Sequence, residues 1–302
     1  MTTTLTSKSP LRSRLTGRNL PRPRKAGWGA VVSGLIVVIA LAWAFVPGLF
    51  ASGDPVNSGS TAPLLPPSTE HWFGTDAVGR DLYTRVVWGT RQSLLGALVA
   101  VLLGMIIGTL LGVIAGSSRA RRGSGTDGRK GSWVDTLIMR IVDVLLAIPA
   151  LLLSLSVIIV LGYGSINAAI AVGITNVAMF ARLARSEVLG VASSDYVEAA
   201  YASGGTRASV LWRHVLPNSL TPVLALAALQ FGSAILQLST LSFLGYGAPP
   251  PTPEWGLIIA EGRDFIATSW WLTVLPGLAI VLVVLATNHL STVLRDREGA
   301  RS

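Results

Sequence analysis

The chain has 302 residues, of which 51% are hydrophobic and 13% are charged, and its formal net charge is +9. Soluble globular domains carry about a quarter charged residues, so this composition indicates a membrane protein. Because the chain has no cysteine, disulfides, thiolate metal sites and cysteine nucleophiles are excluded. His71, His214 and His289 are too scattered to form a zinc motif. The charge does not indicate nucleic-acid binding, because no soluble segment carries a long basic patch.

Uncharged runs predict where the chain crosses a membrane. A bilayer core about 30 Å thick requires about 20 apolar residues in an α-helix. Runs of that length predict helices over residues 28–50, 93–116, 219–245 and 265–290. The longer stretch 144–181 is divided by "GYGSIN" at 162–167, which predicts a third helix starting near Trp133 and a fourth over 168–182. The expected fold class is an all-α membrane protein with six transmembrane helices.

The basic residues predict the orientation of these helices. Segments 1–26, 117–132, 182–217 and 291–302 together carry 19 Lys and Arg residues, whereas 51–92 and 246–269 carry four. Cytoplasmic loops are enriched in Lys and Arg, so both termini are expected in the cytoplasm. The first apolar run exceeds the roughly 7 to 15 residues of a signal-peptide core, which favours a retained helix over a cleaved leader.

These predictions divide the chain into five parts. They are a basic cytoplasmic tail (1–26), a first membrane helix (27–50), an extracytoplasmic loop (51–92), a core of five membrane helices (93–290) and a cytoplasmic tail (291–302). Within the core, residues 183–217 are expected on the cytoplasmic side. The basic "GSGTDGRKGS" at 123–132 lacks the Gly-Lys-Ser/Thr ending of a phosphate-binding loop and is expected to be a flexible loop.

Small residues recur at every fourth position of the second span. A ridge of small residues lets a neighbouring helix backbone approach closely in lipid, where the hydrophobic effect does not drive helix association. The repeat therefore predicts a tightly packed bundle. Its members are Gly96, Ala100, Gly104, Gly108, Gly112 and Gly116.

Charged and polar side chains also occur inside the spans. Arg140 and Asp143 are three residues apart on one helix, so we expect a structural ion pair at the cytoplasmic end, near Asp135, in preference to a proton relay. The fifth span carries one polar stripe, which either lines an aqueous pathway or hydrogen-bonds neighbouring helices. This stripe, the candidate translocation pathway, consists of Gln230, Ser233, Gln237 and Thr240.

The polar insert before the fifth span is predicted to form two short helices. "SSDYVEAAYAS" at 193–203 is a good helix former, and Gly204 follows it, where a left-handed cap is favoured. Thr206 can cap a second helix, "RASVLWRHV", which Pro217 cannot extend freely. Such a small unit cannot bury a core of its own, so its apolar residues are expected to need a surface elsewhere, which indicates a docking element. These residues are Val210, Leu211 and Trp212.

The insert resembles the cytoplasmic loop of ABC importer permeases. The matching residues are Glu198, Ala199, Ala200, Gly204, His214, Leu216 and Pro217, with histidine at 214 where isoleucine is often found. "FGTDAVGRDLYTR" at 73–85 and "LSFLGYGAPPPTPEWG" at 241–256 are similar to the dipeptide, oligopeptide and nickel branch, and in particular to its second permease subunit. Relatives often carry an acidic residue near Gln237 and Leu238, which this chain lacks.

The resemblance implies a type I importer permease fold with cytoplasmic coupling helices, in the bacterial cytoplasmic membrane. It implies a heterodimer with a second permease, two ATPase subunits that hold ATP and magnesium, and an extracytoplasmic substrate-binding protein. The chain itself is then expected to bind no cofactor, metal or nucleic acid. Glu198 would make polar contacts with an ATPase, Ala199 and Ala200 would allow close approach, and Gly204 would set the bend.

Two other classes of function are less well supported. No H-E-x-x-H, G-x-S-x-G or phosphate-loop motif is present, so the sequence does not indicate an enzyme. A secondary transporter is expected to show paired repeats, and none is evident. The substrate stays open among peptides, nickel, glutathione and sugars. Asp76, Arg80 and Asp81 are expected outside the cell, where salt bridges within their segment could offset the arginine charge.

Overall fold

A computed structural model of the chain describes residues 27–57, 61–120 and 128–299. The expected cytoplasmic tail 1–26 lies outside the described residues, as do 121–127 and 300–302. The described part of the expected loop 123–132 is not a loop, because a helix already begins at Gly128.

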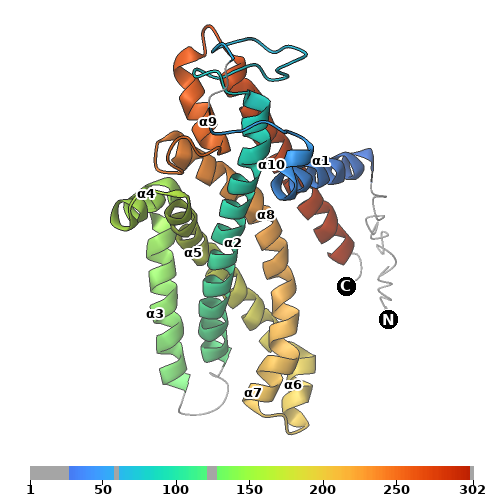
Figure 1. Cartoon of the computed structure of the whole chain (residues 1–302). Helices are drawn as coiled ribbons and strands as arrows, with labels where there is room; N and C mark the ends of the chain where they lie inside the picture. Colours follow the sequence, from blue (N-terminus) through green and yellow to red (C-terminus); the bar gives the residue numbers. More distant parts are fainter. Residues whose placement is uncertain (1–26, 58–60, 121–127, 300–302) are drawn as a thin grey trace, which may run out of the picture.

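The described residues are almost entirely helical, as expected (Figure 1). Loops such as residues 61–81 and 244–254 connect the helices, and the isolated bridge between Thr75 and Asp81 is the only strand-type pairing among the described residues. There are also two short 3₁₀ turns, Pro47–Leu49 and Arg263–Phe265, and one π turn, Leu211–Val215. The α-helices are α1 Trp28–Phe45, α2 Leu82–Ala120, α3 Gly128–Ala147, α4 Ala150–Leu161, α5 Ser165–Ala192, α6 Asp195–Ala202, α7 Arg207–Val210, α8 Leu216–Phe243, α9 Trp255–Gly262 and α10 Trp271–Gly299.

Within the described residues, five helices are long and apolar enough to cross a membrane, namely α1, α2, α5, α8 and α10. The span that contains α8 starts at Arg207 and so includes α7 and the turn between them. The third expected span is not one straight helix, because α3 and α4 meet at an angle of 100°. Pro149 is the N-cap of α4. A proline disfavours helical geometry in the residue before it and donates no backbone hydrogen bond, which explains the break. Counting the bent pair as one span gives six.

Helix α2 is much longer than the uncharged run that predicted it. Its 39 residues extend about 58 Å, more than the bilayer core requires. About the last quarter of the expected extracytoplasmic loop, from Leu82 onward, is therefore helix. Helix α5 likewise continues to Ala192, ten residues beyond its expected end. Uncharged runs identify the lipid-embedded part of a helix but not its extension into water.

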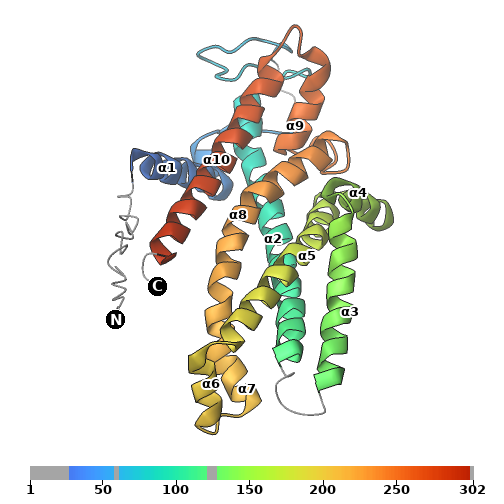
Figure 2. The same cartoon turned by 180° about the vertical axis from the view of Figure 1, so that it is seen from behind.

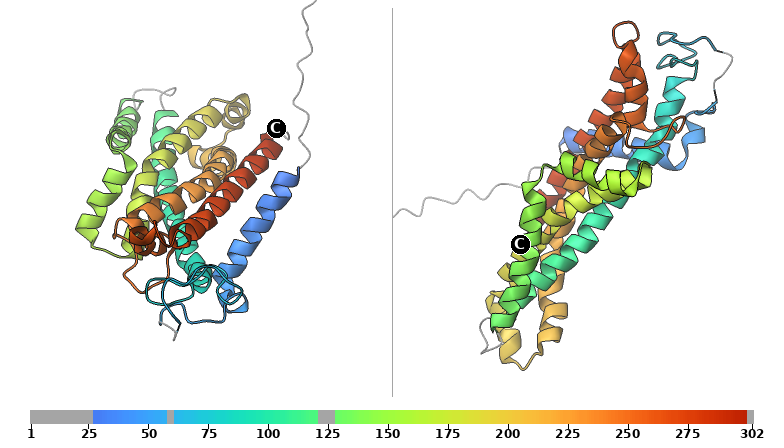
Figure 3. Two further views of the ribbon diagram at one scale, coloured as in Figure 1. Left: turned by 90° about the horizontal axis from the view of Figure 1, so that it is seen from above. Right: turned by 90° about the vertical axis from the view of Figure 1, so that its left-hand side faces the viewer.

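The long helices carry different elements at their two ends. The short helices α6 and α7 lie at one end, beside the ends of α2 and α3, while α9 and the segment before α2 lie at the other (Figures 1 and 2). Viewed from above, α1 runs beside α10 at the edge of the bundle (Figure 3). Both ends of the bundle therefore carry structure outside the apolar spans.

The small-residue ridge of α2 packs directly on α5, which confirms the predicted close packing. A Cβ atom added at Gly108 would lie 2.5 Å from the carbonyl oxygen of Val177, and one at Gly112 would lie 2.5 Å from that of Ala181. Real Cβ atoms do not approach that closely, so only glycine fits. Gly104 and Gly116 face α5 in the same way, whereas Gly96 faces Leu238 of α8.

We expect Gly108→Ala to destabilise the bundle, because the added methyl group would overlap the α5 backbone. Overpacking of this kind costs about 1 to 3 kcal/mol. Gly34→Ala is the matched control, since Gly34 also lies in a membrane helix but has no atom within 4 Å of the position that an added Cβ would occupy. Thermal unfolding of the purified variants in detergent measures the difference. Equal melting temperatures for the two variants would contradict the packing described here.

Candidate functional site

The bend between α6 and α7 has the geometry that the sequence predicts. Gly204 has a φ of +87°, the left-handed conformation that glycine adopts without strain. The amide of Gly205 donates to the carbonyl of Ala200 (3.1 Å) and that of Gly204 to Tyr201 (3.0 Å), the two bonds of a Schellman motif. The hydroxyl of Thr206 accepts from the amide of Ser209, so the second helix is capped as expected.

As expected, this hairpin, residues 195–215, does not bury its apolar residues by itself, but the surface that covers them belongs to membrane helices of the same chain. Val210 is 1% exposed and packs with Val188 of α5 and Val197 of α6. Leu211 is half-buried against the same cluster, and Val113 of α2 also contacts it. Helices α2 and α5 supply this surface, which a short isolated hairpin would lack. The expected need for an external surface therefore applies to Trp212 alone, which is 69% exposed.

The predicted docking residues fall into two groups. Glu198, Ala199, Gly204 and Pro217 are exposed, whereas Ala200, His214 and Leu216 are partly buried. With the exposed Trp212, the first group presents a free surface at the end of the molecule. No atom lies within 4 Å of the position that a Cβ on Gly204 would occupy, so the bend itself is open to a partner.

Pro217 does not end the second helix. A π turn over Leu211–Val215 joins α7 to α8, and Pro217 lies in the first turn of α8. Proline donates no backbone hydrogen bond, and the wider π turn directly before it lets the helix path continue past that position. The hairpin is therefore continuous with a membrane helix instead of being hinged to it.

Two side chains that the sequence did not indicate hold the π turn in place. The Tyr196 hydroxyl donates to the carbonyl of His214 (3.0 Å), and the Asn218 amide donates to the same oxygen (2.7 Å). Asn218 also donates to the Tyr196 hydroxyl (3.0 Å), and the rings of Tyr196 and His214 meet edge to face. A π turn displaces the regular helix bonds, and these side-chain bonds to the His214 carbonyl tie the turn to α6 and α8.

The polar stripe of α8 occupies several environments. Gln230 is buried and donates to the Asn176 amide oxygen of α5 (3.0 Å), which makes it a contact between helices. Ser233 is half-buried, and the side-chain oxygen of Gln237 is buried without a hydrogen-bond partner among the described residues. Thr240 is exposed and donates to a carbonyl of its own helix. Asn176 was not indicated by the sequence.

The prediction of an ion pair between Arg140 and Asp143 is wrong, because Asp143 pairs with another arginine. Asp143 lies 2.6 Å from Arg182 of α5, and Arg140 is exposed. The two residues lie on one helix, but α5 packs beside α3 and its arginine reaches Asp143 across the interface. Asp135 is 2% exposed and bonds the guanidinium of Arg185, with one contact of 2.9 Å. Arg119 of α2 lies 3.2 Å from the same carboxylate, so three helices meet at Asp135.

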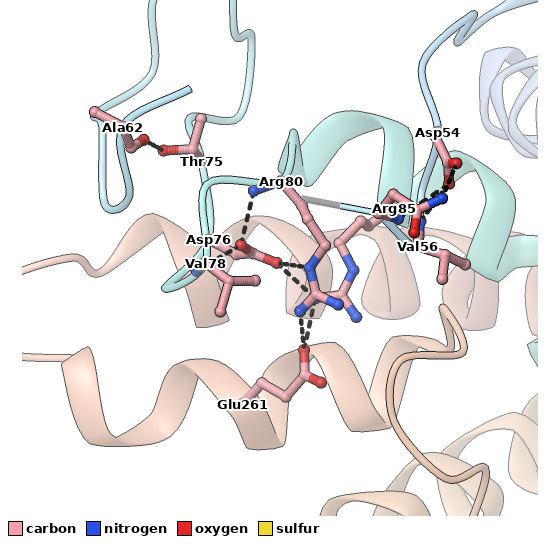
Figure 4. Close-up of polar contacts among 10 residues, drawn as sticks. Asp54, Val56, Ala62, Thr75, Asp76, Val78, Arg80, Arg85 and Glu261 are labelled. Atoms are coloured by element: carbon pink, nitrogen blue, oxygen red, sulfur yellow. Dashed lines mark hydrogen bonds and ion pairs between the residues drawn. The ribbon is translucent and has the colours of Figure 1, made fainter. Parts of the chain in front are cut away.

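At the opposite end, a buried charged cluster joins α2 to α9 (Figure 4). Asp76 contacts Arg80 (2.6 Å) and Arg85 (2.9 Å), and Arg85 also contacts Glu261 (2.5 Å). The expected salt bridge within this segment is confirmed for Arg80. Glu261 is a further partner that lies 176 residues after Arg85 in the sequence. Asp81 instead lies 2.9 Å from His71. The cluster borders a cavity of about 270 Å³.

Glu254 is the N-cap of α9, at the opposite end of this short helix from Glu261. Its carboxylate accepts from the amides of Gly256 (3.1 Å) and Leu257 (3.0 Å) and from the hydroxyl of Ser93 (3.3 Å). Burial raises the pKa of the Glu254 carboxyl. Among the residues that the structure describes, no group of three His, Cys, Asp or Glu side chains could hold a metal ion.

Comparisons with known sequences agree on one family. Residues 108–298 match the family described as binding-protein-dependent transport system inner membrane component. A dipeptide transport system permease protein of Alkalihalophilus pseudofirmus is 40% identical over 96% of this chain and 90% of its own length. A probable D,D-dipeptide transport system permease protein of Escherichia coli is 39% identical (94% and 91%), and a glutathione transport system permease protein of Pectobacterium atrosepticum is 38% identical (88% and 85%).

Solved structures show the same fold at low sequence identity. A methionine ABC transporter in inward-facing conformations superposes with a TM-score of 0.54 at 17% identity, covering 69% of this chain and 95% of the solved chain. An amino acid ABC transporter crystallised with histidines gives a TM-score of 0.54 at 15% identity, with coverages of 72% and 94%. The expected ABC importer permease fold is confirmed.

We expect Tyr196→Phe to loosen the hairpin, because the lost hydroxyl both donates to and accepts from the π-turn network. Losing such a hydrogen bond costs about 1 kcal/mol. Tyr201→Phe is the control, since Tyr201 lies on the same helix, is 45% exposed, and its hydroxyl bonds no other described residue. Hydrogen exchange across residues 195–218 provides the measurement. Equal protection in both variants would show that the network does not hold the turn.

Proposed function

The chain belongs to the family of binding-protein-dependent transport system inner membrane components, and from this premise we propose that it forms, with a second and similar permease, the pathway by which peptides enter a bacterial cell. It is a membrane permease of an ABC importer, and in this family ATP is hydrolysed by separate subunits. The proposal concerns the substrate, the second permease and the orientation.

The exposed hairpin is the observation that carries the proposal. Glu198 and Ala199 are exposed on α6, while Val197 of the same helix is buried against the membrane helices. A helix that is fixed on one face and free on the other suits a docking element for an ATPase subunit. Because α7 continues into α8, a displacement of the hairpin would move a membrane helix directly. The excess of Lys and Arg at this end supports a cytoplasmic location.

The names of the relatives support peptides as the substrate. Two of the relatives are named for dipeptides, and glutathione is itself a short peptide. Nickel and other small solutes are the alternatives. Within the proposed pathway, Ser233, Gln237 and Thr240 are the lining candidates, whereas the bond of Gln230 to Asn176 supports a packing role. The chain has no cysteine, so labelling of a cysteine placed at 237 by a water-soluble thiol reagent tests the lining.

Reconstitution tests the function. A tagged form of the chain is purified with its companions, the binding protein is identified, and mass spectrometry identifies the ligand of that protein. We expect a peptide, and we expect uptake into proteoliposomes only when the second permease, the ATPase subunits and ATP are all present. Uptake by the isolated chain under an ion gradient would overturn the importer mechanism, and a binding protein specific for nickel would overturn the peptide assignment.

We expect Gly204→Val to separate ATP hydrolysis from uptake. A β-branched residue in the left-handed conformation costs about 1 to 2 kcal/mol, so roughly 5- to 30-fold fewer molecules keep the bend. Gly245→Val is the matched control, because Gly245 has a φ of +89°, an equally open surrounding and a place at the opposite end of α8. Peptide taken up per ATP hydrolysed is the measurement. An unchanged ratio in Gly204→Val, or an equal fall in both variants, would refute the coupling role of the bend.

A further inference from the structure

An apolar groove of about 320 Å³ separates α1 from α2 near their outer ends. On α1, Val37, Leu41 and Phe45 line it, spaced four residues apart on one helix face. On α2, Leu95 and Leu98 line it at the helical spacing that continues from Arg91. The groove leaves space that a separate body can occupy beside the two helices.

The exposed side chains of the groove require an apolar occupant. Leu41, Leu95 and Leu98 are 45%, 45% and 43% exposed. Phe231 of α8 and Val283 of α10 close the groove behind them. Apolar cavities do not hold ordered water, which needs polar partners. An alkyl chain gains dispersion contacts with every wall of such a groove.

Arg91 is a cation at the mouth of this groove. It is exposed, and its side chain makes no hydrogen bond or ion pair with any other residue that the structure describes. The other arginines of α2, Arg85 and Arg119, both pair with carboxylates. A charge at the edge of the hydrocarbon core is costly unless it reaches an anion or water. The planar guanidinium can donate two parallel hydrogen bonds to the oxygens of a phosphate group.

The depth of Arg91 corresponds to the level of lipid headgroups. It lies two residues before Ser93, where the uncharged run of α2 begins. The uncharged run of a membrane helix marks its passage through the hydrocarbon core, so the residues just before it lie at the level of the headgroups. An acyl chain in the groove would therefore place its phosphate beside Arg91.

We propose that this groove is a phospholipid site, in which an acyl chain lies between α1 and α2 and an anionic headgroup phosphate accepts hydrogen bonds from Arg91. The inference rests on the groove and its cation, and it does not depend on the transported substrate. The charge on Arg91 selects phosphatidylglycerol over a zwitterionic lipid with the same chains. A helix of the second permease seated in the groove is the competing occupant.

Native mass spectrometry tests the headgroup contact. The full chain is purified with its companion subunits in detergent and titrated with palmitoyl-oleoyl phosphatidylglycerol or the matching phosphatidylcholine. We expect Arg91→Gln to weaken phosphatidylglycerol binding about fivefold and to leave phosphatidylcholine unchanged, the effect that one basic side chain produces near an anionic lipid. Arg263→Gln, which removes another exposed arginine, is expected to change neither. Equal weakening for both lipids, or no change in Arg91→Gln, would overturn the assignment.

Photocrosslinking tests the acyl-chain position independently of Arg91. Phosphatidylglycerol with a diazirine in its acyl chain is incorporated into proteoliposomes that hold the assembled subunits. We expect crosslinks concentrated at residues 37–45 and 94–98. Crosslinks spread equally over the other exposed apolar residues of α2, such as Ile106 and Leu110, would indicate only a general lipid shell and overturn the site. Crosslinks absent from 94–98 would indicate that a protein helix covers the groove, with the same consequence.

Discussion

The close approach of α2 and α5 is the contact on which the rest of the bundle depends. Glycines at 104, 108, 112 and 116 let the backbones meet over four successive turns, where a side chain would overlap α5. In lipid, such packing replaces the hydrophobic effect as the force that holds helices together. At the hairpin end, α2 supplies Val113 and the part of α5 beyond its apolar span supplies Val188 to the hairpin core. The same contact thus holds the bundle together and supports the docking surface.

Ion pairs connect neighbouring helices at both ends of the bundle. At the hairpin end, Asp135 joins α3 to α5 and α2, with Arg185 as its principal partner. At the other end, Arg85 joins α2 to α9 through Glu261. Unpaired charges would be costly at the boundaries of a bilayer, so pairing across helices fixes their relative positions as well as offsetting the charge. Arg91 differs from these residues because its surroundings are apolar and open to lipid.

The hairpin combines a fixed side with a free side. Valines and the Tyr196 network hold one side against the membrane helices, while Glu198 and Trp212 stay exposed. A surface that is already ordered loses little conformational entropy when a partner binds. The π turn makes the hairpin and α8 one continuous helix path, so the docking surface and a membrane helix can move together.

The sequence by itself determined the features that depend on local chemistry. Uncharged length identified the membrane helices, the spacing of glycines identified the close-packing face of α2, and Gly204 with Thr206 identified the bend and its cap, because each of these follows from neighbours along the chain. Only the tertiary structure decided which distant residues meet. Arg182, and not Arg140, pairs with Asp143; Glu261 completes the cluster at Arg85; and Asn176 receives the bond of Gln230. These pairings depend on how helices cross in space, and a one-dimensional pattern carries no information about that crossing.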